Sequence, residues 1–307
     1  MTKNKIILLI PYFGKWPEWF HLFFETMRRN EKIDFHFFTD CETQSYSASN
    51  VHFEMMNFDE YVKHAQGQIS SPINIQNPYK ICDLRPLFGK IHSRTVEGYD
   101  FFGWMDIDLL LGDISAFLTP EILNSYDVFS THADRISGHF ALFRNNLKNK
   151  EVYKRIYQWE EALNNPEFVG IDEYGITNAY TQTFLDKIRD KFKIDLSNSL
   201  SNWYKRQKAK KMHMVEQYTT PFLPKPWLDG SVNSEQPSNW TYIDGEITNN
   251  RDDRNFMYLH FMNFKNSQWR HDGTKAPWEG KDKICSAQAK DLKTGVRIDL
   301  SGIHPLI

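Results

Sequence analysis

The sequence is poor in cysteine and has almost no net charge. Its three cysteines, Cys41, Cys82 and Cys285, are odd in number and far apart. This spacing argues against a disulfide framework and against a CxxC metal knuckle, and it suits a reducing compartment. The formal net charge of -2 gives no global attraction to nucleic acid or to an anionic membrane. We therefore expect a cytoplasmic protein that binds no nucleic acid.

The sequence also lacks any stretch close to the roughly 20 apolar residues that a membrane-spanning helix needs. The apolar run at residues 6–10 is closed by Pro11 and is too short for a signal peptide, so it predicts a buried strand. Any membrane contact would be peripheral, at the inner face of the cell membrane. The candidate for it is a basic cluster beside Trp203 and Tyr204, although such clusters are more often solvated helix faces: Lys205, Arg206, Lys208, Lys210 and Lys211.

What the sequence does contain is enough apolar material for a large core. Hydrophobic residues make up 40% of the 307 residues, and aromatic residues 15%. Residues 42–78 are polar and predict a loose connection in which only 51–53 resemble a strand. Because strand-like and helix-like segments alternate over the first 190 residues, the sequence predicts an α/β fold with a mostly parallel central sheet flanked by helices. The expected strands are residues 6–10, 33–40, 101–105, 127–131, 138–145 and 257–264, and the expected helices follow Pro17, begin near Pro86 and Asp172, and span 148–163.

An acidic pair, Asp106 and Asp108, directly follows the buried run FFGWM. Alternate side chains of a strand share one face, so the two carboxylates can converge on one divalent cation. Mg²⁺ and Mn²⁺ are commonly shared between one or two carboxylates and substrate phosphates. In open α/β sheets, ligands bind at the carboxyl ends of the strands, where Asp40 would also lie. The alternative is a solvated acidic turn, since a DxD string is common by chance.

Several segments resemble glycosyltransferases of the GT-A fold, specifically the bacterial enzymes that build capsule, O-antigen and lipooligosaccharide chains. They are IILLIPYFG, YKICDLRPLFG, FFGWMDIDLLLGD, GHFALFRN, GIDEYG and LHFMNFK. The resemblance implies a GT-A domain at residues 1–265, with an acceptor-side insertion at 190–250, and a C-terminal extension at 266–307 packed on that domain.

The resemblance also implies roles for individual residues around a UDP-sugar. Pro11 and Tyr12 would lie beside the base, and Asp40 near the uracil or ribose. Lys80, Asp83 and Arg85 would lie along the ribose and donor sugar, with Asp106 facing the ribose. Ser137, Gly138 and His139 would lie beside the sugar, and Lys265 would contact the diphosphate. The implied metal ligands are Asp106, Asp108 and His260, for Mn²⁺ or Mg²⁺. For His260, a satisfied histidine on a core strand is the alternative.

Asp172 and Glu173 are the candidate catalytic residues. An inverting transfer needs one carboxylate to take the proton of the acceptor hydroxyl, and one of this pair could do so. The alternative is that both residues simply begin a helix, where acidic side chains are favoured.

Together, the patterns predict a metal-dependent hexosyltransferase. The donor would be a UDP-sugar such as UDP-galactose, and the acceptor a hydroxyl of a bacterial surface polysaccharide or of its lipid-linked precursor. A Mg²⁺-dependent nucleotidyltransferase or phosphohydrolase would use similar acidic strand ends, but neither GxxxxGK nor an HExxH-like spacing is present. A carbohydrate-binding protein that has lost turnover is the third alternative.

Overall fold

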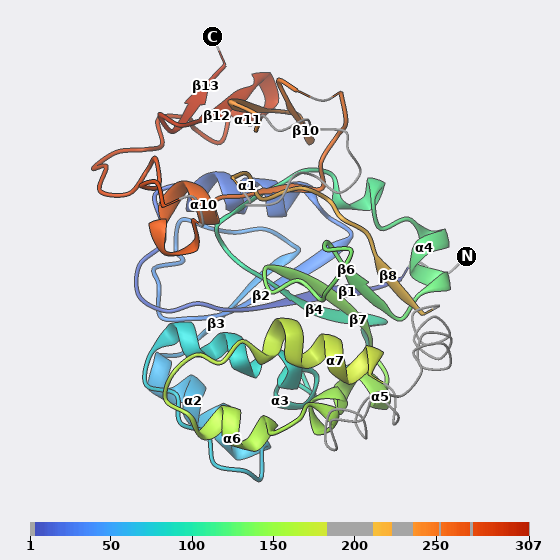
Figure 1. Ribbon diagram of the computed structural model, residues 1–307. Coiled ribbons are helices and arrows are strands. Elements are labelled where there is room, and N and C mark those ends of the chain that lie inside the picture. The colour runs from blue at the N-terminus through green and yellow to red at the C-terminus, as the bar shows by residue number, and fades with distance from the viewer. Residues whose placement is uncertain (1–3, 183–210, 223–235, 252, 271–272, 307) are drawn as a thin grey trace.

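The computed structural model describes residues 4–182, 211–222, 236–251, 253–270 and 273–306 (Figure 1). Seven of the described strands form one central sheet, in which only β7 runs antiparallel to its neighbours. The predicted α/β fold with a mostly parallel sheet is therefore confirmed. The strands, in spatial order, are β3 (Val51–Met55), β2 (Ile33–Thr39), β1 (Ile6–Pro11), β4 (Phe101–Met105), β7 (Phe140–Arg144), β6 (Val128–Ser130) and β8 (Met212–Met214).

Apolar side chains on both faces of the sheet explain why its central strands are continuous hydrophobic runs. Leu8 belongs to the hydrophobic cluster that includes residues of helix α1 (Phe20–Arg29). Leu9 belongs to a second hydrophobic cluster, which includes residues of helices α2 (Phe58–Gln68) and α3 (Phe88–Ile91). Helices therefore cover the sheet from opposite sides, as Figure 1 shows. The same lower layer holds α5 (Leu147–Lys150), α6 (Trp159–Asn164) and α7 (Ile176–Thr181).

Several predicted elements differ from the observed ones. The polar stretch 42–78 contains helix α2, which begins with a capping box between Asn57 and Glu60. The helix predicted at 148–163 is divided into α5, the 3₁₀ turn Val152–Arg155 and α6, because Gln158 adopts a left-handed backbone with φ 52°. The helix expected near Pro86 is a 3₁₀ segment, Pro78–Leu87, that continues into α3.

The strand predicted at 257–264 is also shorter than expected. Strand β11 (Tyr258–His260) ends where Phe261 leaves the extended conformation, and helix α10 (Met262–Lys265) follows. Strand β11 pairs antiparallel with β5 (Leu109–Leu111), which places His260 opposite Leu109. This pairing brings a late segment of the chain next to the acidic pair.

A second sheet lies on the α1 side of the molecule (Figure 1). Its strands, in spatial order, are β10 (Glu246–Asn249), β9 (Asn239–Ile243), β12 (Val296–Asp299) and β13 (Ile303–Pro305). The predicted boundary after residue 265 thus divides a hydrogen-bonded sheet. The remaining described helices are α4 (Pro120–Ser125) and α11 (Asp291–Thr294), with 3₁₀ turns at Ile114–Ala116 and Ser267–Trp269.

Two predicted features, the basic cluster and the acceptor-side insertion at residues 190–250, fall partly outside the described residues. The basic cluster is described only at Lys211, whose backbone oxygen accepts a hydrogen bond from the backbone N–H of Asp127. Among the described helices, none has the length and apolar character needed to cross a membrane.

Gly103 allows β4 and β7 to approach closely, and this contact gives a stability prediction. A Cβ atom at Gly103 would lie 2.1 Å from the backbone oxygen of Ala141. We expect Gly103→Ala to lower the free energy of unfolding by about 1–3 kcal/mol, as overpacking of a rigid core does. Urea denaturation measures this loss. The matched control is Gly67→Ala in α2, where a Cβ meets no atom within 4 Å and a helical alanine is favoured; equal losses in both variants would contradict the prediction.

Candidate active site

The candidate site lies at the edge where β1, β2 and β4 end. Tyr12, Asp40 and Asp106 follow these three parallel strands, so their positions share one edge of the sheet. Strand β7 runs the opposite way and starts at this edge, where the Asp106 N–H donates to the backbone oxygen of His139 over 3.1 Å. The predicted site residues of four strands are thereby brought to one edge, the usual ligand-binding edge of an open α/β sheet.

Asp106, Asp108 and His260 form a cluster that could hold a metal ion. Each residue offers one ligand atom, and these atoms all lie within 4.8 Å of one another. The two acids occupy the turn between β4 and β5 rather than one strand face, and β11 brings His260 to them. Asp108 and His260 are buried, whereas Asp106 is half-buried.

The donor set fits Mg²⁺ or Mn²⁺. Carboxylate oxygens suit both ions, and an imidazole nitrogen suits Mn²⁺. His260 Nδ1 lies 3.0 Å from the hydroxyl oxygen of Thr220, and Nε2 lies 3.4 Å from Asp108 Oδ2. When Nδ1 carries the proton and donates it to Thr220, Nε2 presents a lone pair toward the cluster. Thr220 thus makes the kind of hydrogen bond that commonly orients a histidine at a metal site.

Two basic side chains neutralise the acidic pair. Lys265 Nζ lies 2.8 Å from Asp108 Oδ2, and the Arg85 guanidinium forms an ion pair with Asp106. Burial alone would raise the pKa of Asp108, but the positive charge of Lys265 and the contact with His260 outweigh burial and hold that pKa well below its usual range. Asp108 is therefore ionised and available as a ligand at neutral pH.

Arg85 joins the acidic pair to the candidate catalytic residue Asp172. Its Nη1 donates to Asp172 Oδ2 over 3.0 Å and to the backbone oxygen of Gly138 over 2.6 Å, while its Nη2 bonds to Asp106. Burial raises the pKa of Asp172 to about 7, against the lowering effect of Arg85. The second oxygen of Asp172, Oδ1, is buried and has no hydrogen-bond partner in the described part of the chain. A buried carboxylate with one unpaired oxygen is suited to accept a proton.

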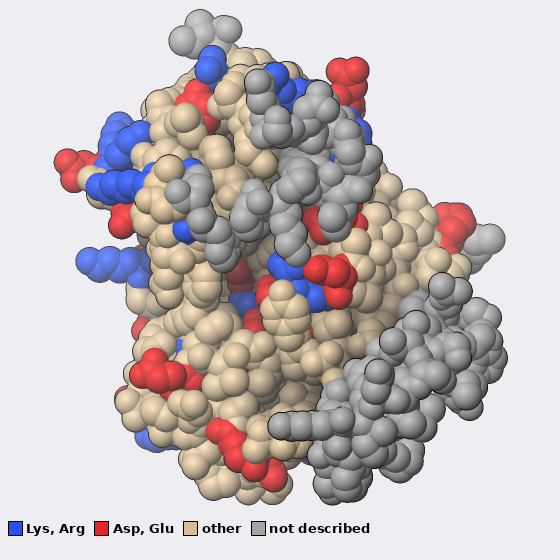
Figure 2. All heavy atoms as spheres, viewed as in Figure 1, with Lys and Arg blue, Asp and Glu red and all other residues tan. Residues whose placement is uncertain are grey.

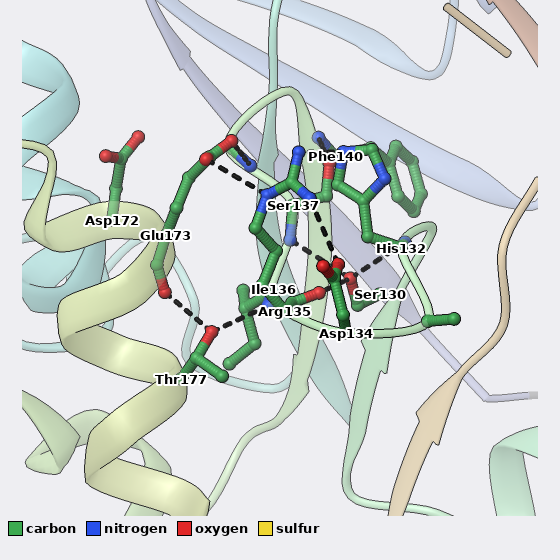
Figure 3. Close-up of polar contacts among 12 residues, drawn as sticks. Ser130, His132, Asp134, Arg135, Ile136, Ser137, Phe140, Asp172, Glu173 and Thr177 are labelled. Atoms are coloured by element: carbon green, nitrogen blue, oxygen red, sulfur yellow. Dashed lines mark hydrogen bonds and ion pairs between the residues drawn. The ribbon is translucent and has the colours of Figure 1, made fainter. Parts of the chain in front are cut away.

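The Glu173 side chain extends toward Arg135 and the loop 135–138, as Figure 3 shows. Its Oε1 accepts a hydrogen bond from the Gly138 N–H over 3.1 Å, and its Oε2 accepts one from Arg135 Nε over 3.2 Å. Thr177 adds a third link, because its hydroxyl accepts from the Ile136 N–H over 2.8 Å and donates to the Glu173 backbone oxygen over 2.6 Å. Glu173 therefore fixes the loop 135–138 against the helical turn.

Gly138 lies against the turn that carries Asp172 and Glu173, and His139 lies against His260 of the metal cluster. A Cβ at Gly138 would meet Glu173 Oε1 at 2.9 Å and Asp172 Oδ2 at 3.4 Å, so only glycine allows this approach. The His139 ring stacks on His260, with 4.3 Å between the ring centroids. Its Nε2 is buried and unpartnered among the described residues. Burial, together with the neighbouring histidines, lowers the pKa of His139 well below its usual value, so the ring is neutral.

Lys80 and Asp83 are fully buried and do not line an open surface. Lys80 Nζ lies 2.8 Å from Asp83 Oδ2 and donates to the backbone oxygens of residues 162 and 167, each over 2.7 Å. The Asp83 carboxylate accepts from the N–H groups of residues 169, 170 and 171 over 2.8–3.0 Å. The pair thus holds the backbone that leads into Asp172, and direct contact with a ribose would require this backbone to move.

The residues predicted beside the base lie at the ends of β1 and β2. Tyr12 follows Pro11 and stacks on Trp16, with centroids 5.4 Å apart and planes 9° apart. Asp40 is exposed, and its Oδ1 accepts a hydrogen bond from the Gly14 N–H over 2.7 Å. Burial raises the pKa of Tyr12; the charge of Lys265 opposes this rise, and the charge of Asp108 adds to it. These residues therefore sit on the β1 side of the metal cluster, with an aromatic face and an exposed carboxylate.

Sequence reasoning did not identify Arg135, Thr220 or Thr177. Each acts through a contact with a residue that is distant in the sequence, and none lies in a distinctive motif. The face of the molecule in Figure 2 is hollowed near its centre, and acidic and basic side chains gather in that hollow. This mixture of charges matches the alternating acids and bases of the site.

Comparisons with known proteins give a family and a set of distant structures. A family described as "Family of unknown function (DUF6625)" matches residues 8–286. No curated protein matches the sequence. Three of the similar solved structures are of glycosyltransferases, each with a TM-score below 0.5.

One of them is mouse xyloside xylosyltransferase 1 in its apo form, with 8% identity, a TM-score of 0.34 and coverage of 76% of this chain and 92% of that one. Another is the galactosyltransferase LgtC with donor and acceptor sugar analogues, with 12% identity, a TM-score of 0.32 and coverage of 56% and 70%. An active-site mutant of LgtC has 13% identity, a TM-score of 0.34 and coverage of 67% and 87%.

The Lys80–Asp83 pair gives a second stability prediction. Removing one partner of a buried ion pair leaves the other charge uncompensated, so we expect Asp83→Ala to lower the free energy of unfolding by about 3–5 kcal/mol. The control is Glu151→Ala, which breaks a pair with the same i,i+3 spacing to Lys154 at an exposed position. This control should cost at most about 1 kcal/mol in the same denaturation experiment. Similar small losses in both variants would show that the buried pair does not support the site.

Proposed function

The chain belongs to the DUF6625 family, and we propose that it is a metal-dependent glycosyltransferase that uses a UDP-sugar donor. The observation that carries this proposal is the cluster of Asp106, Asp108 and His260 with Lys265 beside it. Two carboxylates, an imidazole and an ammonium at the ligand-binding edge of an α/β sheet suit a divalent cation together with a diphosphate. Tyr12 and Asp40 on the β1 side suit the uridine.

In this proposal, the metal cluster and Lys265 act on the leaving group. Asp106, Asp108 and His260 hold Mn²⁺ or Mg²⁺, which when bound neutralises charge that develops on the departing diphosphate. Lys265 adds a second positive charge on the same side. Arg85 keeps Asp106 oriented and lies where it can also reach a donor sugar or ribose, whereas Gly138 and His139 border the space for the sugar.

Asp172 acts as the general base. The acceptor hydroxyl oxygen attacks the anomeric carbon, its proton passes to Asp172, and the bond from the anomeric carbon to the diphosphate oxygen breaks. This is an inverting transfer with atoms and charges balanced. The Oδ1 of Asp172 has no partner among the described residues, and it must become accessible when the acceptor binds. Glu173 positions the loop 135–138 rather than taking the proton, because both of its oxygens are already bonded.

The finer assignments follow the sequence resemblance. We propose a hexose donor such as UDP-galactose, and as acceptor a hydroxyl of a bacterial surface polysaccharide or its lipid-linked precursor. The reaction would take place in the cytoplasm, with any membrane contact at the inner face of the cell membrane. A screen of UDP-, GDP- and CMP-sugars for metal-dependent donor hydrolysis tests the donor. Release of UMP and a sugar 1-phosphate instead of UDP would favour a phosphohydrolase. Release of pyrophosphate from UTP and a sugar 1-phosphate would favour a nucleotidyltransferase.

The metal site predicts a cation-dependent nucleotide affinity. Calorimetry should show that Mn²⁺ strengthens UDP binding to the wild-type protein. In Asp108→Asn this strengthening should fall by at least about tenfold, or about 1.4 kcal/mol, because a carboxylate ligand is lost. The control is Asp113→Asn, which changes a nearby exposed aspartate outside the cluster and keeps its capping oxygen. The proposed site would be ruled out if UDP affinity did not depend on Mn²⁺, or if the effect of Mn²⁺ on that affinity were the same in Asp108→Asn as in wild type.

The raised pKa of Asp172 predicts a pH dependence. A protonated carboxyl cannot accept the hydroxyl proton, so the transfer rate should rise with pH through a midpoint at about 7 and fall below it. Asp172→Asn should lower the rate by at least about 100-fold and abolish this dependence, as removal of a general base does. Glu173→Gln serves as the comparison: it should keep a pH dependence but move the midpoint to lower pH, because the charge of Glu173 helps to raise the pKa of Asp172. Initial rates of UDP release measure both, and an unchanged profile in Asp172→Asn would show that another group is the base.

A further inference from the structure

Three aromatic side chains from separate segments meet beside the candidate site. Tyr79 lies in the 3₁₀ segment Pro78–Leu87, Phe168 precedes the turn that carries Asp172, and Trp269 ends the 3₁₀ turn Ser267–Trp269. The ring centroids of Tyr79 and Phe168 are 4.9 Å apart with planes at 69°, and those of Tyr79 and Trp269 are 6.2 Å apart with planes at 28°. Tyr79 and Trp269 therefore present nearly parallel rings.

The aromatic cluster is not part of the hydrophobic core. Tyr79 is 50% exposed, and Phe168 and Trp269 are half-buried. None of the three packs in either of the two large apolar clusters that flank the central sheet. Exposed aromatic rings that gather from distant segments commonly mark a binding surface. Burial of the core thus does not explain why these rings lie together.

The cluster borders the proposed reaction centre. Tyr79 directly precedes Lys80, whose buried ammonium is fixed by three bonds, and Phe168 lies four residues before Asp172. Trp269 lies four residues after Lys265. Partial burial raises the pKa of Tyr79; the charges of Cys82, Asp106 and Asp172 raise it further, and the charge of Arg85 opposes this rise. The rings thus connect the two segments that carry the proposed base and the diphosphate lysine.

We propose that Tyr79 and Trp269, supported by Phe168, form a stacking platform for a pyranose ring of the acceptor saccharide. A pyranose has an apolar C–H face and polar edges. Its face would lie on the aromatic rings, while a hydroxyl at its edge points toward Asp172, whose buried Oδ1 must become accessible as the acceptor binds. This inference rests on the proposed function and assigns the residues that would hold its saccharide acceptor.

A uracil base could also stack on aromatic rings. The platform suits the acceptor better because Tyr12 and Asp40, the residues proposed for the base, lie at the ends of β1 and β2, whereas Tyr79 and Phe168 adjoin the backbone that leads into Asp172. The two ligands therefore make different predictions for variants of the platform.

The test is an NMR titration of the full chain with methyl β-D-glucopyranoside, methyl β-D-galactopyranoside and methyl β-D-N-acetylglucosaminide. The indole N–H signal of Trp269, assigned by its loss in Trp269→Phe, should shift with at least one glycoside. Tyr79→Ala should weaken the binding of that glycoside about tenfold, as expected for one lost stacking ring. Tyr79→Phe should bind it with the wild-type affinity. Calorimetry with UDP and Mn²⁺ should give the same affinity for all of these variants and wild type.

Tyr157→Ala is the control, because Tyr157 is 84% exposed and has no ring contact among the described residues. No shift of the Trp269 signal with any of the three glycosides would overturn the platform, as would a loss of UDP affinity in Tyr79→Ala, which would assign the rings to the base. Failure of wild type to bind UDP with Mn²⁺ would instead contradict the proposed transferase. If Tyr79→Ala does not fold, the titrations of wild type and Tyr79→Phe still decide the test.

Discussion

The guanidinium of Arg85 is the interaction on which the candidate site depends. It bonds at once to Asp106, to Asp172 and to the backbone oxygen of Gly138. Without it, two carboxylates would face each other in a poorly solvated space, and like charges so placed cannot both stay ionised. Arg85 therefore permits Asp106, a candidate metal ligand, and Asp172, an acid of raised pKa, to occupy neighbouring positions. The planar fork of arginine suits this task, and the single point charge of a lysine would not.

Buried contacts hold the 3₁₀ segment that carries Arg85 in place. Arg85 belongs to the same 3₁₀ segment as Lys80 and Asp83, whose buried pair anchors the segment to the backbone before Asp172. The position of Arg85 relative to Asp172 is thus set by hydrogen bonds on both sides, rather than by the flexible arginine side chain alone. A buried pair costs desolvation free energy, which the surrounding backbone partners offset.

The extent to which the sequence predicted this arrangement depends on the range of each interaction. The central strands were predictable because burial on both faces makes them continuous apolar runs, and Asp106 with Asp108 because the pair is local. Helix α2 was missed because few of its residues are buried. The burial of Lys80 was also missed, since its partners lie at residues 83, 162 and 167. Long-range pairing leaves no pattern within a single sequence.

The charges of the site indicate how metal and donor binding would be coupled under the proposed function. In the structure, Lys265 is bonded to Asp108, the acid that a divalent cation would also need. A cation at Asp108 offsets the negative charge that holds the lysine, and the ammonium is then free to turn to a phosphate oxygen. A diphosphate in turn supplies oxygen ligands that the three protein ligands leave unfilled. Each ligand thus removes a cost of binding the other, so binding of metal and donor should be mutually favourable.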